Sequence, residues 1–150
     1  MLSRKSSSKL KPGKDFIGVG GGALIVNEKG ETLLIRRTSA ARNDAGVWSQ
    51  PGGTLDYGET VKEMVIREIK EELGVDIELL ELLCYSDQIL ADEEQHWVAI
   101  SFLAKISSGE PQNLEPHKHD TIKWFTFDKL PSRLSKPTQD AVKKYLDGKS

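Results

Sequence analysis

The stretch GTLDYGETVKEMVIREIKEELGV, residues Gly53–Val75, decides the fold of this chain. Its second half predicts a helix. Thr60 followed by Glu63 is typical of a capping box, so we expect the helix to begin there. Gly74 stands where a left-handed C-terminal cap is usual. With successive residues about 100° apart, one arc of the helix is apolar, and we expect it to face a core. That arc comprises Val65, Ile66, Ile69 and Leu73.

A second arc of the same helix is acidic. Glu68, Glu71 and Glu72 follow the spacing i, i+3 and i+4, so their carboxylates crowd together. Arg67 is one turn from Glu63 and Glu71, which leaves Glu68 and Glu72 facing each other without a basic partner on the helix. Hard divalent cations bind such carboxylate oxygens. A solvated acidic face is the alternative interpretation.

The residues before the helix favour a ligand site over a solvated face. Pro51, Gly52 and Gly53 form a turn in which paired glycines let the backbone approach a ligand closely. The loop then leads into a helix N-terminus, which suits an anion. The sequence therefore places a turn for anions next to a cluster of carboxylates.

The whole stretch resembles the signature of the Nudix hydrolases, G-x5-E-x7-R-E-U-x-E-E-x-G-U, in which U is a bulky aliphatic residue. Every specified position of the signature matches. The matching residues are Gly53, Glu59, Arg67, Glu68, Ile69, Glu71, Glu72, Gly74 and Val75. The resemblance covers about residues 15 to 147, closely in this stretch and more loosely elsewhere.

Composition and charge exclude several classes of protein. The 150 residues are 37% hydrophobic and 29% charged, as in an ordinary globular domain. A net charge of -2 favours neither a nucleic-acid duplex nor a membrane as partner. No apolar run is long enough to span a bilayer. Cys84 is the single cysteine, so we expect a small buried hydrophobe and a reducing, cytoplasmic compartment.

The chain divides into a tail and one domain. Residues 1–14 predict a disordered basic tail, because five lysines and arginines lie among serines there. A targeting or nucleic-acid role is the alternative to a solvated terminus. Residues 15–150 predict the domain, which the resemblance identifies as a Nudix hydrolase domain.

Outside the central helix, apolar alternation and turn residues predict strands. We expect a hairpin from residues 16–27 and 32–37, a short strand over 47–50, a second hairpin from 75–86 and 96–106, a last strand over 121–127 and a terminal helix over 136–146. This order predicts an α+β fold. The resemblance makes it the Nudix fold, a mixed β-sheet sandwiched between helices.

The resemblance implies a metal site on the central helix. Nudix enzymes cleave a nucleoside diphosphate linked to another group, with water attacking one phosphorus and metal ions neutralising the developing charge. Carried over by position, Glu68, Glu71 and Glu72 are ligands of Mg²⁺, for which Mn²⁺ substitutes. The backbone carbonyl of Gly52 completes the metal shell.

The resemblance also implies catalytic residues. Glu59 and Arg67 orient the loop and the helix by pairing, and Glu71 contributes a direct or water-mediated contact. Glu68 or a carboxylate of the loop deprotonates the attacking water. The long polar loop over 107–120 offers two such carboxylates, Glu115 and Asp120, and the sequence leaves the choice open.

Substrate binding is assigned to the glycine turn and to an arginine. Gly52 and Gly53 let phosphates approach the backbone. Arg37 ends a predicted strand, and its guanidinium suits phosphate oxygens, with a surface charge as the alternative. Ser49 and Gln50 are both candidates to contact the base, because strand alternation does not say which side chain points inward.

The resemblance also bears on the nucleotide substrate. The chain is most similar to small MutT-like enzymes, which cleave nucleoside triphosphates, including oxidised or non-standard dNTPs, to monophosphate and pyrophosphate. Hydrolysis of NDP-sugars or dinucleoside polyphosphates is the alternative, followed by a nucleotide-sensing module. A homodimer is compatible with all three. The pair His117 and His119 predicts no zinc site, since structural zinc takes four N or S ligands.

Overall fold

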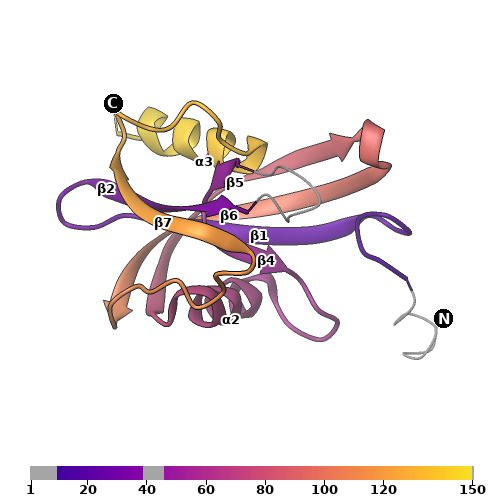
Figure 1. Cartoon of the computed structure of the whole chain (residues 1–150), viewed down its shortest axis with the longest axis horizontal. Coiled ribbons are helices and arrows are strands. Elements are labelled where there is room, and N and C mark those ends of the chain that lie inside the picture. The colour runs from indigo at the N-terminus through magenta and orange to yellow at the C-terminus, as the bar shows by residue number, and fades with distance from the viewer. Residues whose placement is uncertain (1–9, 39–45, 150) are drawn as a thin grey trace.

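The computed structural model describes residues 10–38 and 46–149. The helices α2 (Val61–Leu73) and α3 (Lys136–Asp147) lie on opposite sides of a layer of strands (Figure 1). The elements are β1 (Gly18–Ile25), β2 (Glu31–Arg37), β3 (Trp48–Ser49), β4 (Gly52–Thr54), α2 (Val61–Leu73), β5 (Asp76–Leu90), the 3₁₀ turn η1 (Ala91–Glu93), β6 (Gln95–Ser108), β7 (His119–Thr126) and α3 (Lys136–Asp147). The predicted α+β architecture with strands between two helices is confirmed.

The strands form two sheets. One has the order β4-β1-β6-β5 and the other the order β3-β2-β7. The pair β1 and β6 runs parallel, and the remaining neighbours are antiparallel, so the larger sheet is mixed. The hairpin of β5 and β6 is present as predicted, and β5 continues to Leu90, beyond its expected end.

The predicted hairpin of residues 16–27 and 32–37 is wrong. β1 and β2 belong to different sheets, and a single bridge between Val26 and Thr32 joins them beside the turn. The reason is that both edges of β1 are occupied, by β4 on one side and β6 on the other. Gly22 of β1 lies so close to β4 that an added Cβ would overlap the carbonyl oxygen of Pro51.

Helix α2 begins and ends where the sequence predicts. The Thr60 hydroxyl accepts a hydrogen bond from the Glu63 amide at 3.1 Å, and the Glu63 carboxylate accepts one from the Thr60 amide at 2.9 Å. Gly74 is left-handed, with φ of 73°, and its N–H donates to the Lys70 carbonyl. Both ends of the helix are therefore set by interactions within a few residues.

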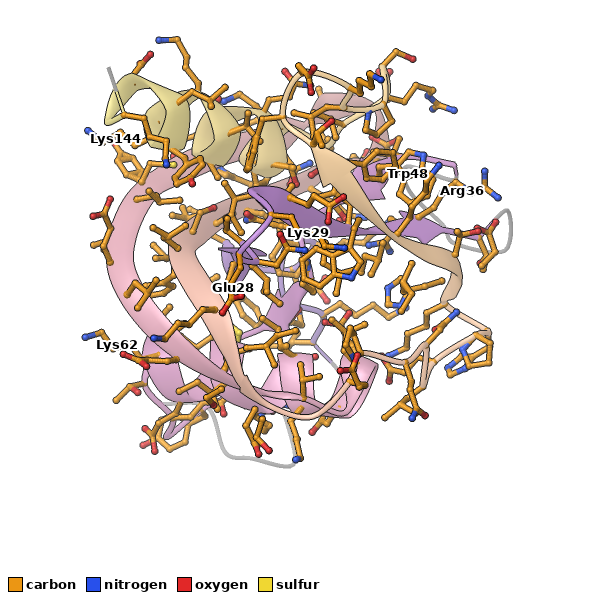
Figure 2. The ribbon with its side chains drawn as sticks, turned by 90° about the vertical axis from the view of Figure 1, so that its left-hand side faces the viewer. Glu28, Lys29, Arg36, Trp48, Lys62 and Lys144 are labelled. Atoms are coloured by element: carbon orange, nitrogen blue, oxygen red, sulfur yellow. The ribbon has the colours of Figure 1, made fainter. Side chains whose placement is uncertain are left out.

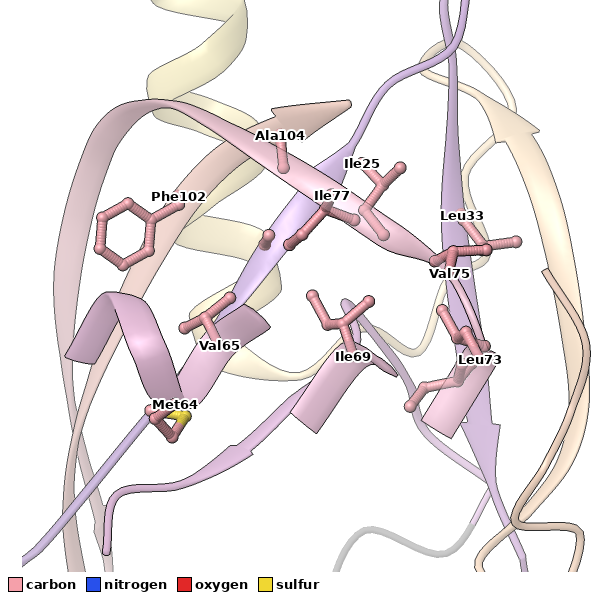
Figure 3. Close-up of a cluster of buried hydrophobic side chains, with 12 residues drawn as sticks. Ile25, Leu33, Met64, Val65, Ile69, Leu73, Val75, Ile77, Phe102 and Ala104 are labelled. Atoms are coloured by element: carbon pink, nitrogen blue, oxygen red, sulfur yellow. The ribbon is translucent and has the colours of Figure 1, made fainter. Parts of the chain in front are cut away.

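The buried face of α2 differs by one residue from the predicted arc. Val65, Ile69 and Leu73 are buried, but Ile66 is 41% exposed and Met64 is fully buried in its place. Figure 3 shows Val65, Ile69 and Leu73 of α2 lying toward apolar side chains from the strands, and Met64 belongs to the same buried cluster. Because the helix is turned toward Met64, its C-terminal end also buries Glu72.

Helix α3 packs on the other face, over a second apolar cluster. Leu24 and Leu83 of the larger sheet meet Ala141 and Val142 of α3. Cys84 packs at the edge of this cluster and is half-buried, and burial raises the pKa of its thiol. None of the described helices is long and apolar enough to cross a membrane.

The predicted basic tail lies mainly outside the described residues, which begin at Leu10. Its last residues pack on the domain. Gly13 is buried against Trp97, and its carbonyl accepts a hydrogen bond from the His96 amide at 2.7 Å. Ordered packing therefore begins slightly before the predicted boundary at residue 15.

Candidate active site

Glu72 is the most deeply buried acid of the described chain. Its side chain is 4% exposed, and one carboxylate oxygen accepts a hydrogen bond from the Gly52 amide at 2.9 Å. Burial raises its pKa well above the ordinary value, and the charges of Glu68 and Glu115 raise it further, against the lowering by the Gly52 N–H. A carboxylate that is buried beside two other acids, without a cation among its hydrogen-bond partners, is a strong candidate for a metal ligand.

Glu68 lies one turn before Glu72 and borders the glycine turn. Its carboxyl group lies directly over Gly53, where an added Cβ would overlap it. Arg67 donates a hydrogen bond to Glu68 at 2.9 Å, so the prediction that Glu68 lacks a basic partner on the helix is wrong. Burial raises the pKa of Glu68, and the Arg67 guanidinium opposes this shift.

Arg67 connects the helix to the loop before it. It donates two hydrogen bonds to Glu59, at 2.7 and 3.0 Å, which is the pairing the sequence predicts. This contact lowers the pKa of Glu59. The expected pairing of Arg67 with Glu63 does not form, because the Glu63 carboxylate caps the helix.

Glu71 faces away from the cleft described below. Its side chain is 52% exposed, and it accepts a hydrogen bond from Arg67 at 3.3 Å. Among the described residues, Glu71 joins neither the cleft lining nor the cluster of possible metal ligands. The structure thus brings Glu68 and Glu72 to one place and leaves Glu71 on the outer side of Arg67.

The loop before β7 supplies a further acid to the site. Possible ligand atoms of Glu72, Glu115 and His119 lie within 4.8 Å of one another. Asp120 instead accepts a hydrogen bond from Arg36 at 2.7 Å, outside the cleft that Glu115 lines. Of the two loop acids that the sequence left open, Glu115 therefore lies at the site and Asp120 lies outside it.

His119 is a site residue that the sequence reading did not select. Its Nε2 is 3.5 Å from a carboxylate oxygen of Glu72. Burial, followed by the charge of Arg37, lowers the pKa of His119 to about 4, so the ring is neutral near pH 7 and the contact is not an ion pair. The sequence signal that could have found it is its place in the polar loop over 107–120, next to the candidate acid Asp120. His117, two residues earlier, does not line the cleft.

These residues line one cleft, which we call the carboxylate cleft. Its volume is about 500 Å³. Its lining includes Gly52, Gly53, Glu68, Glu72, Glu115, His119 and Arg37, and also Ser49, Gln50, Trp97, Ala99 and Pro137. The register of β2 and β7 sets Arg37 opposite His119. The cleft thus combines acids, the exposed cations Arg37 and Lys118, and a wall with apolar side chains.

Ser49 and Gln50 both reach the carboxylate cleft. Gln50 is 8% exposed, and its side-chain amide donates to the Ser101 hydroxyl at 2.8 Å, while its backbone N–H donates to Thr138. These contacts fix Gln50 beneath α3. The structure shows both residues at the wall of the cleft and does not separate them by position alone.

The oxygen donors of the carboxylate cleft favour a hard divalent cation. Carboxylate oxygens are the ligands that Mg²⁺ takes from proteins, together with substrate phosphates. Glu72 is desolvated, Glu68 is half-buried and Glu115 is nearby, so a divalent cation would offset charge that the described residues leave only partly compensated. The site fits a hard cation and an anionic ligand together.

Comparison with known proteins agrees with this geometry. A family model described as the NUDIX domain matches residues 17–146. The crystal structure of a MutT Nudix hydrolase from Burkholderia pseudomallei is 45% identical, with a TM-score of 0.79 over 85% of this chain and 96% of that chain. The residues matched by the family model include all the strands, α2 and nearly all of α3.

Two curated proteins extend the comparison. A MutT-like protein of Streptomyces ambofaciens is 30% identical over 83% of this chain and 74% of its own length. A Mus musculus protein named 8-oxo-dGDP phosphatase is 32% identical over 75% of this chain and 33% of its own length. The chain spans about a third of the length of several curated relatives that it matches.

Proposed function

We propose that this chain, which belongs to the Nudix hydrolase family, cleaves nucleoside triphosphates to monophosphate and pyrophosphate with the help of Mg²⁺. Nudix hydrolases act on phosphoanhydride bonds, so the class of reaction follows from the family. The observation that carries the proposal is the buried Glu72 beside Glu68 and Glu115, in a cleft that also holds an exposed arginine.

Glu68 and Glu72 are the residues we assign as metal ligands, and the backbone at Gly52 borders the same place. A bound Mg²⁺, or Mn²⁺ in its place, would neutralise charge on the phosphates. The residues fit such a cation because burial disfavours the ionised form of both carboxylates, which a cation would reverse. Glu71 has a different role in this proposal, since it holds Arg67 from the outer side.

Glu115 is our candidate for the group that accepts a proton from the attacking water. The alternative is Glu68, but Arg67 donates a hydrogen bond to that carboxylate at 2.9 Å, whereas the Lys118 ammonium is 3.5 Å from the Glu115 carboxylate. Glu115 lies close to Glu72 in the carboxylate cleft. Glu59 and Arg67 are positioning residues, because their paired hydrogen bonds fix the loop against the helix that carries Glu68.

Substrate phosphates are assigned to the glycine turn and Arg37. Gly53 leaves room for the Glu68 carboxyl group and for close approach of a ligand to the backbone. Arg37 is exposed at the wall of the cleft, where its guanidinium suits phosphate oxygens. The nucleoside would then lie toward Trp97 and Pro137, where the wall is more apolar.

Oxidised guanine nucleotides are included among the candidate substrates, because one relative is named for 8-oxo-dGDP. The unpaired Cys84 supports a reducing compartment such as the cytoplasm. We further propose that the catalytic domain is residues 15–150 and that residues 1–14 are a basic extension of it.

The test uses the purified full chain. After treatment with a chelator, we expect no turnover of dNTPs, and we expect Mg²⁺ or Mn²⁺ to restore it. Canonical dNTPs, 8-oxo-dGTP, 8-oxo-dGDP, ADP-ribose and diadenosine tetraphosphate are compared under the same conditions. Hydrolysis in ¹⁸O-water with mass analysis identifies the attacked phosphorus. Full activity without metal, or release of orthophosphate and a diphosphate from dNTPs, would contradict the proposal.

A further inference from the structure

A second cleft lies beside the carboxylate cleft and is rich in arginine. Its volume is about 400 Å³, and its lining includes Arg36, Arg37, Arg133, Trp48 and Asp120. We call it the arginine cleft. Figure 2 shows Arg36 and Trp48 close together near the margin of the molecule, and the Arg36 guanidinium lies 5.5 Å from the centre of the Trp48 ring.

The arginine cleft has more positive than negative charge. Asp120 accepts a hydrogen bond from Arg36 at 2.7 Å, and this contact lowers the pKa of the aspartate. Arg37 and Arg133 form no ion pair with another described side chain. Among the residues that the structure describes, two guanidinium groups of this cleft therefore remain for an anionic ligand.

The walls of the arginine cleft are held in place by packing. The Trp48 ring meets Phe125 edge to face at 5.0 Å, and its backbone pairs with Arg36 in the sheet. The Trp48 amide also donates to the carbonyl of Arg133 at 2.8 Å, which ties the segment before α3 to the small sheet. The backbones of Arg36 and Arg133 are thus both hydrogen-bonded or paired to Trp48, whose ring is packed against Phe125.

The two clefts are joined through Arg37, which lines both. The β2 and β7 ladder is irregular between Arg36 and Arg37, so these neighbours depart from regular alternation. Arg37 lies opposite His119 of the carboxylate cleft, while Arg36 binds Asp120 in the arginine cleft. An anion that leaves the carboxylate cleft past Arg37 therefore meets further guanidinium groups.

We propose that the arginine cleft is a phosphate-binding site, which takes either the distal phosphate of the bound nucleotide or the pyrophosphate released from it. Guanidinium groups match phosphate oxygens in charge and in hydrogen-bond geometry. The identity of these two ligands rests on the proposed function. The site itself rests on the residues of the cleft, so the two are tested separately.

Pyrophosphate binding to the chelator-treated protein tests the site without turnover. Because Arg37 and Lys118 also line the carboxylate cleft, binding at the arginine cleft is identified by its loss in a variant of the arginine cleft alone. Arg133→Ala is the variant, because Arg133 is exposed and lies outside the assigned catalytic set. Lys29→Ala is the matched control, an exposed cation in the turn between β1 and β2. We expect calorimetry to show binding about 5- to 10-fold weaker for Arg133→Ala and unchanged for Lys29→Ala.

Steady-state kinetics with Mg²⁺ separate the two sources of phosphate. If the cleft holds the distal phosphate, Arg133→Ala raises KM for the dNTP, and kcat stays near the wild-type value. If it holds the product, Arg133→Ala leaves KM unchanged and weakens inhibition by pyrophosphate. Either result supports the site. Absent pyrophosphate binding, or binding equal in the wild type and both variants, would overturn it. Failure of the proposed function instead appears as wild-type protein that does not cleave dNTPs.

Discussion

Two adjacent glutamates in the last turns of α2, Glu71 and Glu72, lie in different surroundings. Glu72 is 4% exposed, accepts a hydrogen bond from the Gly52 amide and lies near Glu115 and His119. Its neighbour Glu71 is 52% exposed and contacts Arg67. An acidic run in a helix is therefore not one functional unit. The rotation of the helix against the sheet decides which acid enters a site and which remains at the surface.

Of the substitutions considered, Glu72→Gln should have the largest effect on turnover. Charge stabilisation by a metal is worth several kcal/mol, so we expect turnover to fall about 1000-fold when one ligand charge is removed. The metal-free protein should melt at the same or a higher temperature. The folded-state pKa of Glu72 is raised, so its ionised form opposes folding at neutral pH, and a neutral amide removes that cost.

Glu71→Gln is the matched control for Glu72→Gln, and it should retain most of the turnover. Thermal melts with and without Mg²⁺ accompany the assays, and the gain in melting temperature from Mg²⁺ should shrink only for Glu72→Gln. If both variants lose turnover equally, the division of α2 into an inner and an outer acid is wrong.

Glu115→Gln extends the comparison to the loop before β7. General-base catalysis contributes about 100-fold or more, so we expect a loss of about that size in kcat. Asp120→Asn is the control, because Asp120 contacts Arg36 outside the carboxylate cleft. Stopped assays over a range of dNTP concentrations separate kcat from KM. Equal losses in the two variants would remove the basis for choosing Glu115 over Asp120.

Arg67→Lys tests the outer side of the helix. Arg67 donates to Glu59 through two nitrogens and also to Glu68, a fork that a lysine does not reproduce. We expect kcat to fall about tenfold, because supporting contacts of this kind typically contribute that much. Circular dichroism checks that the fold is intact. Unchanged kcat would show that Glu68 keeps its position without the fork.

Thr60→Ala should have the smallest effect, at the far end of α2. Loss of an N-terminal cap costs about 1 kcal/mol of stability. Activity per folded molecule should stay at the wild-type value, since the capping box is remote from the acids of the last turns. Thr60→Ser keeps the hydroxyl and serves as the control. Urea denaturation measures the difference, and a loss of turnover in folded Thr60→Ala would link this end of the helix to the site.

The sequence predicted the parts of the molecule that depend on neighbours in the chain. The bounds of α2 follow from Thr60, Glu63 and Gly74, which contact residues within one turn. The hairpin of β5 and β6 also needs only a local connection. The pairing of Glu59 with Arg67 was predictable because the family signature specifies both residues.

The errors arise where distant segments meet. Ile66 is exposed and Met64 buried because the strands, not the helix, fix the rotation of α2. β1 does not pair with β2, since β4 and β6 occupy its two edges. The choice between Glu115 and Asp120 depends on how β7 enters the sheet beside Arg37. The spacing of residues within one segment predicts none of these three contacts, because each forms between segments far apart in the sequence.

The parallel pairing of β1 with β6 has a consequence for synthesis of the chain. Gly18 pairs with Trp97 and Ile25 with Ala104, so β1 leaves the ribosome long before its partner exists. The glycine turn after β3 packs against β1, and the carboxylate cleft shares residues from β1 and β6. A nascent chain that stops before β6 therefore lacks residues that line the completed cleft. We expect hydrolytic competence to arise late in translation, after the slow closure of this long-range pair.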